Sequence, residues 1–456
     1  GQLTEAMFRL GDLHACGDHA RRALAHFGFV VPGETRVGLL VAILREAVVR
    51  ALQVVLRVRS VDVERASRVV DAVSPVQYRL IETFFYSLEA LPLVWGTLRL
   101  MNQCEPVGPR PDLARGYVLA GLLAGVVPAP RVAEAWCRRA IAIATATGSR
   151  QDVGWIHART AVFQIGVCRW EEALAGVNLG IASAAEAGDL RMWEEIHLEG
   201  GLLHFFTGQL DRAAEWLEHS YESTLRSGNL QSRTGAMILR ADVLVRLGRD
   251  AEARVLIADT RRLLEHADVR ASRSEVASAV STEALLCLRA GDHRGAYDAV
   301  TEAMSVLGAS QPVGYWMLPS LSAVAEVLLT LAESASLGPE WHDVLMRQAR
   351  LAIRIFRGFA KHLPFARAAA LSWRGTFAWV RGRRPLAMRC WRRAIDAGAA
   401  QRMPYDLARA HLELGRHLDP QSPARIAHLR EALATFDRLG CTTESASVRG
   451  QLGTSA

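Results

Sequence analysis

One spacing constrains this chain more than any other feature: turns built on small residues recur at intervals of 40 residues through its middle. Helix-period apolar residues fill the intervals, and a fixed period of this size indicates a stack of two-helix units. One turn recurs at Gly148, Gly188 and Gly228, and Ala267 and Asp268 follow 39 positions after the last of these. A second turn recurs at Cys168, Gly208 and Gly248.

Small side chains also occupy fixed places around the second turn. They stand seven positions before it, five after it and twelve after it, where packed helices must approach closely. This spacing resembles that of the tetratricopeptide repeat, although the interval exceeds the ~34 residues usual for that repeat. The predicted fold is therefore all-α, a right-handed superhelical solenoid of tetratricopeptide-like hairpins. The three sets are Ala161, Gly201 and Ala241; Ala173, Ala213 and Ala253; and Gly180, Ser220 and Thr260.

The repeats also organise the chain as a whole. At 456 residues it is longer than one hydrophobic core usually serves, so the repeats imply an array. We expect irregular helical repeats over 1–147, regular repeats over 148–307, and longer hairpins with a cap over 308–456. The first hairpin lacks most of its front helix, so we expect the array to be truncated at its start and the chain to be a fragment.

Turn residues set the expected helix boundaries. A long apolar helix is predicted over 36–56 with a shorter helix near 62–72 beside it, and Ser74-Pro75 is interpreted as a break before a separate helix over 76–86. Later hairpins are predicted at 151–166 with 170–186, 190–207 with 211–227, 230–247 with 250–266, 273–290 with 293–307, 316–334 with 340–362, and 404–417 with 423–438.

Composition excludes several classes of protein. Hydrophobic residues make up 50% of the chain, but no run reaches the ~20 apolar residues that a membrane span needs, and the start lacks a secretory layout. The seven cysteines form no CxxC pair, so we expect reduced thiols in a cytoplasmic protein. The formal charge of +7 is scattered without an array of basic and aromatic residues, which disfavours nucleic-acid binding.

Motifs for catalysis and cofactors are absent from the sequence. It holds no phosphate-binding loop, no dinucleotide fingerprint and no HExxH or GxSxG pattern, so we predict no catalytic residue and no cofactor. His197 and His204 share a helix, but seven residues separate them by about 10 Å, too far for joint ligation without a second helix. We interpret them as core or solvated histidines and predict no metal site.

The candidate binding surface follows from the repeat geometry. First helices of stacked hairpins line the concave side of a solenoid, where they can hold a peptide or a small polar ligand. An ordinary hydrated groove is the alternative interpretation. The repeat register directs these side chains into the groove: Trp155, Glu195, Phe205, Asp242, Arg246, Ser281 and Arg289.

Several segments resemble one known architecture. Residues 314–319 (GYWMLP), 373–375 (WRG) through 381–383 (RGR), 403–405 (MPY) and 410–416 (AHLELGR) are similar to the C-terminal repeat region of large bacterial signalling proteins. In that family a class III nucleotide cyclase or protein kinase domain precedes a STAND-type ATPase module and then the repeats. The resemblance implies a regulatory role here, with any catalytic domain upstream.

Three classes of function remain. The first is a non-catalytic regulatory or scaffold module that binds a protein segment or effector, or contacts upstream domains of its own polypeptide, with self-association as a further option. The second is an enzyme that uses the groove for a small-molecule substrate. The third is a nucleic-acid-binding repeat protein, whose affinity would fall steeply with salt.

Overall fold

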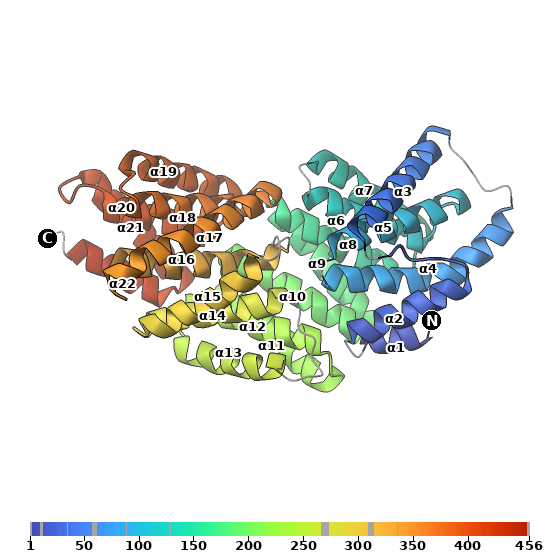
Figure 1. The fold of residues 1–456 in the computed structure, drawn as a ribbon, viewed down its shortest axis with the longest axis horizontal. Helices are drawn as coiled ribbons and strands as arrows, with labels where there is room; N and C mark the ends of the chain where they lie inside the picture. Colours follow the sequence, from blue (N-terminus) through green and yellow to red (C-terminus); the bar gives the residue numbers. More distant parts are fainter. Residues whose placement is uncertain are drawn as a thin grey trace. The chain divides into compact units, whose positions relative to one another are not determined.

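The computed structural model describes residues 2–9, 12–33, 35–56, 62–87, 89–126, 129–265, 273–308, 314–334 and 336–453. The expected turn residues Ala267 and Asp268 lie outside these ranges. Within them the regular structure is helical, so the predicted all-α repeat fold is confirmed (Figure 1).

The helices form two compact units. Unit 1 comprises Gly1–Gln164, Glu171–Ile196 and Ser223–Gln231, and unit 2 comprises Ile165–Trp170, His197–Glu222 and Ser232–Ala456. The boundary between the units therefore passes through helices of the regular repeats. The three segments expected from repeat regularity stay a prediction.

Unit 1 is built from the N-terminal helices and parts of the first regular repeats. The α6 and α7 helices pack as an antiparallel hairpin, and the end of α5 continues into a short 3-10 turn before α6. The helices are α1 (Gln2–Arg9), α2 (Leu13–His26), α3 (Arg36–Leu56), α4 (Val63–Tyr86), α5 (Ala90–Cys104), α6 (Pro111–Val126) and α7 (Pro130–Thr147), with parts of α8 (Arg150–Gly166), α9 (Trp170–Ala187), α10 (Leu190–Phe206), α11 (Leu210–Ser227) and α12 (Leu230–Arg246).

The predicted break at Ser74-Pro75 is wrong, because α4 runs through both residues. Proline removes one backbone hydrogen bond, but the buried stripe of Val70, Val73 and Val76 continues across it at helical spacing. Tertiary packing therefore overrides the local signal. The α4 helix packs against α2 and α5, and α3 packs against α5.

The second of the two recurring turns, at Cys168, Gly208 and Gly248, has the same backbone conformation in each repeat. Gly208, Gly248 and Gly291 have φ between 73° and 79°, the left-handed region that ends many helices and suits glycine. Cys168 takes the same place with φ 61°, although it has a side chain. The turn, rather than the glycine, is therefore the repeated feature.

The small residues beside these turns lie where helices touch. A Cβ built on Gly201 in α10 would come 2.7 Å from the Leu217 side chain in α11, so this glycine stands at the seam within a hairpin. Gly180 in α9 faces Ala158 in α8 and Ile196 in α10, each 2.8 Å from a built Cβ. Such spacing leaves no room for a larger side chain.

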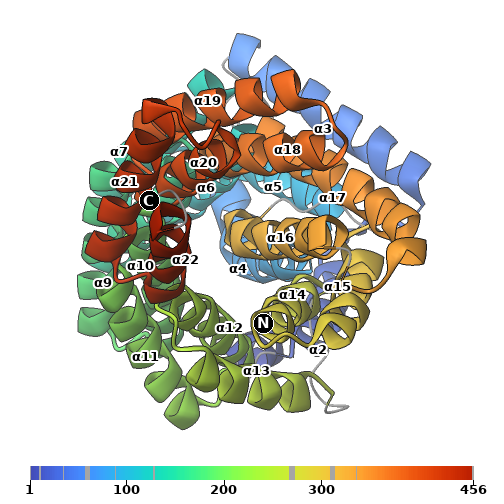
Figure 2. The same ribbon diagram turned by 90° about the vertical axis from the view of Figure 1, so that its left-hand side faces the viewer.

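Unit 2 continues the hairpins, and the pairs predicted from 151 onward are confirmed. Figure 2 shows α12, α14, α16, α18 and α20 on the inner side of this unit and the intervening helices on its outer side. Besides the end of α10, its helices are α11, α12, α13 (Asp250–Glu265), α14 (Arg273–Arg289), α15 (His293–Leu307), α16 (Leu318–Ser334), α17 (His342–His362), α18 (Arg367–Val380), α19 (Arg384–Gln401), α20 (Pro404–His417), α21 (Pro423–Leu439) and α22 (Thr442–Gly453).

The last helix of unit 2 packs against its early helices. Thr442 Oγ1 donates to the Leu247 carbonyl at 3.1 Å, beside Gly248, where any side chain would collide with Thr442. Glu444 also forms an ion pair with Arg289 at 2.9 Å. These contacts place α22 against the turn after α12 and against the end of α14.

One stretch among the described residues, Tyr315–Ser334, is long and apolar enough to cross a membrane. In this structure 78% of that stretch is buried. Its main helix, α16, packs against α14, α17 and α18. Neighbouring helices thus account for its apolar composition, as they do for a core helix of a folded protein.

Candidate functional site

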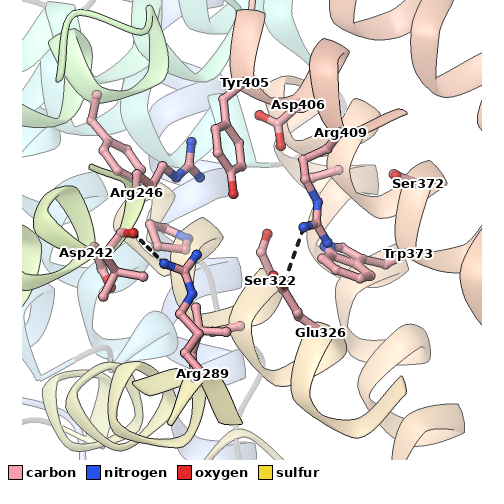
Figure 3. Close-up of a pocket in the computed structure, with 16 residues that line it drawn as sticks. Asp242, Arg246, Arg289, Ser322, Glu326, Ser372, Trp373, Tyr405, Asp406 and Arg409 are labelled. Carbon is pink, nitrogen blue, oxygen red and sulfur yellow. Dashed lines mark hydrogen bonds and ion pairs between the residues drawn. The ribbon is translucent and has the colours of Figure 1, made fainter. Parts of the chain in front are cut away.

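The inner helices of unit 2 line a pocket (Figure 3). The volume inside it that is open to water-sized molecules is about 40 Å³. The pocket crosses the C-terminal ends of α10, α12 and α14 and the N-terminal halves of α16, α18 and α20. Its lining comprises Phe205, Asp242, Val245, Arg246, Leu285, Arg289, Pro319, Ser322, Ala323, Glu326, Ala369, Ser372, Trp373, Tyr405, Asp406 and Arg409.

Arg246 is the most unusual side chain in the pocket. Its Cζ lies 4.1 Å from the ring centroid of Phe205 and 3.5 Å from that of Tyr405, so two aromatic rings hold the guanidinium (Figure 3). The residue is 8% exposed, yet its side chain makes no hydrogen bond or ion pair with any residue that the structure describes. Cation–π contacts stabilise the charge but satisfy none of its five N–H donors.

Asp406, an acidic residue, is also buried at the pocket without a hydrogen-bond partner among the described residues. It is 6% exposed, and within the described ranges its carboxylate also has neither a hydrogen bond nor an ion pair. Burial raises its pKa, while Arg246 and Arg409 oppose that rise. A buried cation and a buried carboxylate therefore both face the pocket with unused hydrogen-bonding capacity.

Ion pairs flank these two groups on either side. Arg409 pairs with Glu326 at 3.2 Å, and its Cζ lies 4.6 Å from the Trp373 ring centroid. On the other side, Glu444 accepts hydrogen bonds from Arg289 at 2.9 Å and from the Tyr405 hydroxyl at 3.0 Å. These partners fix both walls, so the pocket is held in one shape by charge-assisted contacts.

Asp242 is buried beside Arg246. Thr282 Oγ1 donates to its Oδ1 at 2.6 Å. Desolvation raises the pKa of Asp242 to about 7, against the opposing effects of the Thr282 hydrogen bond and the Arg246 charge. The carboxyl group therefore changes charge near neutral pH, where an ordinary aspartate stays ionised.

Four of the seven residues predicted for the groove line this pocket, and three do not. The four are Phe205, Asp242, Arg246 and Arg289. Ser281 is fully buried within α14, where its hydroxyl donates to the Ala277 carbonyl at 2.6 Å. Close packing of α14 against its neighbours at that level covers the position.

The other two predicted residues belong to a separate cluster in unit 1. Glu195 pairs with Arg159 at 2.6 Å and with Arg191 at 3.0 Å, and these two cations lower its pKa against the effect of burial. Trp155 packs edge-on against Tyr78 at 5.6 Å, with the Arg159 guanidinium 5.5 Å from its ring. The charges in this cluster are matched, unlike those of Arg246 and Asp406.

Sequence reasoning missed the second half of the pocket. Glu326, Trp373, Tyr405, Asp406 and Arg409 come from the early turns of α16, α18 and α20. The repeat register pointed to the late turns of the first helices, as in α12 and α14. The pocket instead shifts along successive helices, and the only sequence signal for this was the cluster of Tyr405, Asp406 and Arg409 at helical spacing.

The two histidines considered for a metal site pack on one tryptophan. The ring centroids of His197 and His204 each lie 5.1 Å from that of Trp216 in α11. Burial lowers the pKa of His204, which favours its neutral form. Across the described ranges, no three His, Cys, Asp or Glu residues are grouped to hold a metal ion.

The cysteines are unpaired thiols. Five are buried and two, Cys168 and Cys287, are half-buried. Burial raises the pKa of Cys16 to about 12, and it raises those of the other six as well. Thiols of this kind are poor nucleophiles, so they add no reactive group to the pocket.

Comparison with known proteins gives the fold and no family. Neither a protein-family model nor a curated protein matches the chain. Among solved structures, a Rap protein complexed with competence and sporulation factor is similar at 9% identity and TM-score 0.56, over 86% of this chain and 100% of that one.

Two other solved structures are similar over most of their length. The apo form of the quorum sensor NprR from B. thuringiensis has 13% identity and TM-score 0.49, over 82% of this chain and 97% of that one. Yeast Tom70 has 12% identity and TM-score 0.39, over 94% and 97%. The likeness to the Rap protein supports the helical-repeat architecture, and the chain folds as a tetratricopeptide-like array.

Proposed function

We propose that this chain is a non-catalytic regulatory or scaffold module, and that the pocket in unit 2 binds a peptide segment of a protein partner. The observation that carries the proposal is the pair of opposite charges, Arg246 and Asp406, that face one pocket without a hydrogen bond or ion pair to any described residue. A ligand with matching groups would supply the hydrogen bonds that the protein does not provide to these two side chains. The fitting ligand presents an acidic group to Arg246 and a basic group to Asp406.

The walls of the pocket suit a peptide. Phe205, Trp373 and Tyr405 supply aromatic area, and aromatic and Arg side chains are the usual anchors of binding surfaces. The pocket residues stand on packed helices rather than loops, so little ordering is required on binding. The Rap protein of similar fold was solved in complex with competence and sporulation factor, which agrees with a ligand-binding use of this architecture.

The wider context is also proposed. The similarity of residues 314–319, 403–405 and 410–416 to the repeat region of cyclase and STAND-ATPase proteins favours a signalling polypeptide, with any catalysis in other domains. Occupancy of the pocket would then be transmitted to those domains. A cytoplasmic location fits the thiol content, since disulfides are rare in that compartment.

A peptide library with scanned acidic and basic residues tests the proposal, with affinity measured by fluorescence anisotropy. We expect bound peptides to require an acidic residue, and Arg246→Ala to weaken them by more than about 1 kcal/mol. The peptide affinity of Arg246→Lys should lie between those of wild type and Arg246→Ala, because lysine keeps the charge but loses the planar stacking. Circular dichroism must stay unchanged in both variants.

The matched control is Arg261, which lies in α13 on the outer side and pairs with Glu302 at 2.7 Å. Its replacement by alanine should change peptide affinity by less than about 0.5 kcal/mol. Greater damage from Arg261→Ala than from Arg246→Ala would place the partner on the outer helices and refute the pocket as the site.

One observation favours an enzyme as the second candidate. Asp242 has a pKa near 7 in a pocket that also contains Ser322 and Ser372, and groups tuned to neutral pH are typical of general bases. A panel of hydrolase and transferase substrates would support this candidate if turnover appeared and Asp242→Asn abolished it. Absence of turnover with retained peptide binding would leave the binding module.

A further inference from the structure

The α3 helix in unit 1 has polar groups on its covered face and an apolar exposed face. The inner face is fixed by hydrogen bonds: Glu46 is fully buried and accepts from Asn102 Nδ2 at 3.0 Å and from Arg99 Nη1 at 3.1 Å. Gln53 Nε2 donates to the Asn102 carbonyl at 2.8 Å, and Arg50 pairs with Glu105 at 3.0 Å. The orientation of α3 is thus determined by specific polar contacts with α5 and the turn that follows it.

That orientation leaves the apolar face uncovered. Eight large apolar side chains of α3 are at least half exposed, in a helix where a folded protein would normally bury them. Among the exposed residues of α3, only Arg36 and Arg45 are charged. The eight are Val37, Leu40, Val41, Leu44, Val48, Leu52, Val55 and Leu56.

The exposed residues follow a heptad pattern. Exposed apolar residues stand at 37, 41, 44, 48, 51 and 55, which alternates steps of four and three. In heptad terms Val41, Val48 and Val55 occupy the a positions, and Val37, Leu44 and Ala51 the d positions. Such a repeat predicts packing against a second helix, and β-branched residues at a favour a parallel pair of two.

Charge favours a second copy of the same helix in parallel. Arg45 occupies an e position, and in a parallel pair it faces the g position of the partner, which is Leu40. In an antiparallel pair the two Arg45 side chains would lie opposite each other near the middle, a like-charge contact. A stripe that is complementary to itself suits a two-fold symmetric interface.

The size of the stripe sets the expected strength. From Val37 to Val55 it is about 27 Å long, and pairing would bury on the order of 500 Å² per copy. The total of about 1,000 Å² is at the lower limit for a specific interface, so micromolar affinity is expected. The preformed helix lowers the ordering cost.

We propose that two copies of this chain associate through α3, as a short parallel coiled coil. The uncovered stripe, its heptad spacing and the position of Arg45 all follow from the residues of α3. Peptide binding in unit 2 is not required for this association.

Sedimentation equilibrium of the full chain from about 1 to 100 μM tests the proposal. We expect wild type to convert from monomer to dimer across this range, and Val41→Lys to raise the dissociation constant about a hundredfold, since each dimer would bury two unpaired lysines. Val255→Lys in α13 is the matched control, because the two valines are 63% and 61% exposed. It should leave the constant unchanged.

Single cysteines test the orientation. Val37→Cys and Val55→Cys should each form interchain disulfides with themselves on oxidation in a parallel pair, whereas an antiparallel pair with the two Arg45 side chains opposite each other would bring residue 37 near residue 55 and cross-link only a mixture of the two variants. The wild type, which has no cysteine in α3, is the blank.

Three outcomes would overturn the proposal. They are a wild type that stays monomeric at every concentration, equal effects of Val41→Lys and Val255→Lys, and cross-linking confined to the mixture. Binding of wild type to phospholipid vesicles without dimer formation would assign the stripe to a membrane surface instead. Binding to another protein's helix without self-association would likewise replace the second copy.

Discussion

Replacing Asp242 with asparagine tests the electrostatics of the pocket most directly. Asparagine keeps the size of the side chain and can still accept the Thr282 hydrogen bond, which spans 2.6 Å in the wild type. It removes only the charge that burial disfavours. We therefore expect Asp242→Asn to stabilise unit 2 at a pH where the wild-type carboxyl is ionised.

The magnitude follows from the pKa. Burial raises the pKa of Asp242 from 3.8 to about 7, which corresponds to as much as about 4 kcal/mol between the two protonation states. Because the folded pKa is raised, the contribution of this group is fully present below pH 3.8 and is lost as pH rises through 7. The variant should therefore gain stability at pH 8 and little at pH 4.

Urea denaturation at pH 4, 6 and 8 measures this gain, with the free energy of unfolding compared at each pH. Asp259→Asn in α13 is the control, because that carboxylate is exposed on the outer side and should show no such trend. A variant that is less stable than wild type at pH 8, or equally stabilised at pH 4 and 8, would refute the buried-charge argument.

Three further predictions concern packing, the turns and α22. Gly201→Leu should cost about 1–3 kcal/mol by overpacking the seam with Leu217, whereas Gly358→Leu, on an open helix surface, should be neutral or stabilising; equal melting temperatures would disprove the seam. Cys168→Gly should stabilise by up to about 1 kcal/mol by relieving a left-handed backbone, and a lower urea midpoint would count against it. Glu444→Ala should cost about 2–3 kcal/mol in urea unfolding, because it breaks a buried ion pair, and an unchanged midpoint would show that this contact is weak.

The helical hairpins could be predicted because each one repeats the same local requirements. Two of these requirements can be recognised in the sequence. Small residues recur where helices touch, as at Gly201, and residues that suit a left-handed turn recur about every 40 positions, as at Gly208. The course of α4 could not be predicted in this way. Pro75 is a valid local breaker, and only the packing of the stripe on both sides of it against α2 and α5 keeps the helix continuous.

Four of the residues predicted for a groove line this pocket, and the other residues of its lining were not predicted. The repeat register places residues on the inner side of each first helix, and Asp242 and Arg246 among them line the pocket. In α18 and α20 the pocket is lined by residues from earlier turns of the helix than in α12 and α14. Trp373 and Asp406 could therefore be assigned to it only from the three-dimensional structure. The matched charges around Glu195 likewise depend on Arg159 and Arg191 from two helices.

The ion pair between Arg289 and Glu444 has a consequence for the order in which the pocket is completed during synthesis. The two residues lie 155 positions apart, and Glu444 belongs to the last helix. Chains fold from the N-terminus as they leave the ribosome, so the earlier hairpins can stack before this carboxylate exists. Until it arrives, Arg289 lacks one of its partners and the Tyr405 hydroxyl lacks its acceptor. A nascent chain interrupted before α22 would therefore have its repeats but an unfinished pocket, and binding would begin only once translation has passed Glu444.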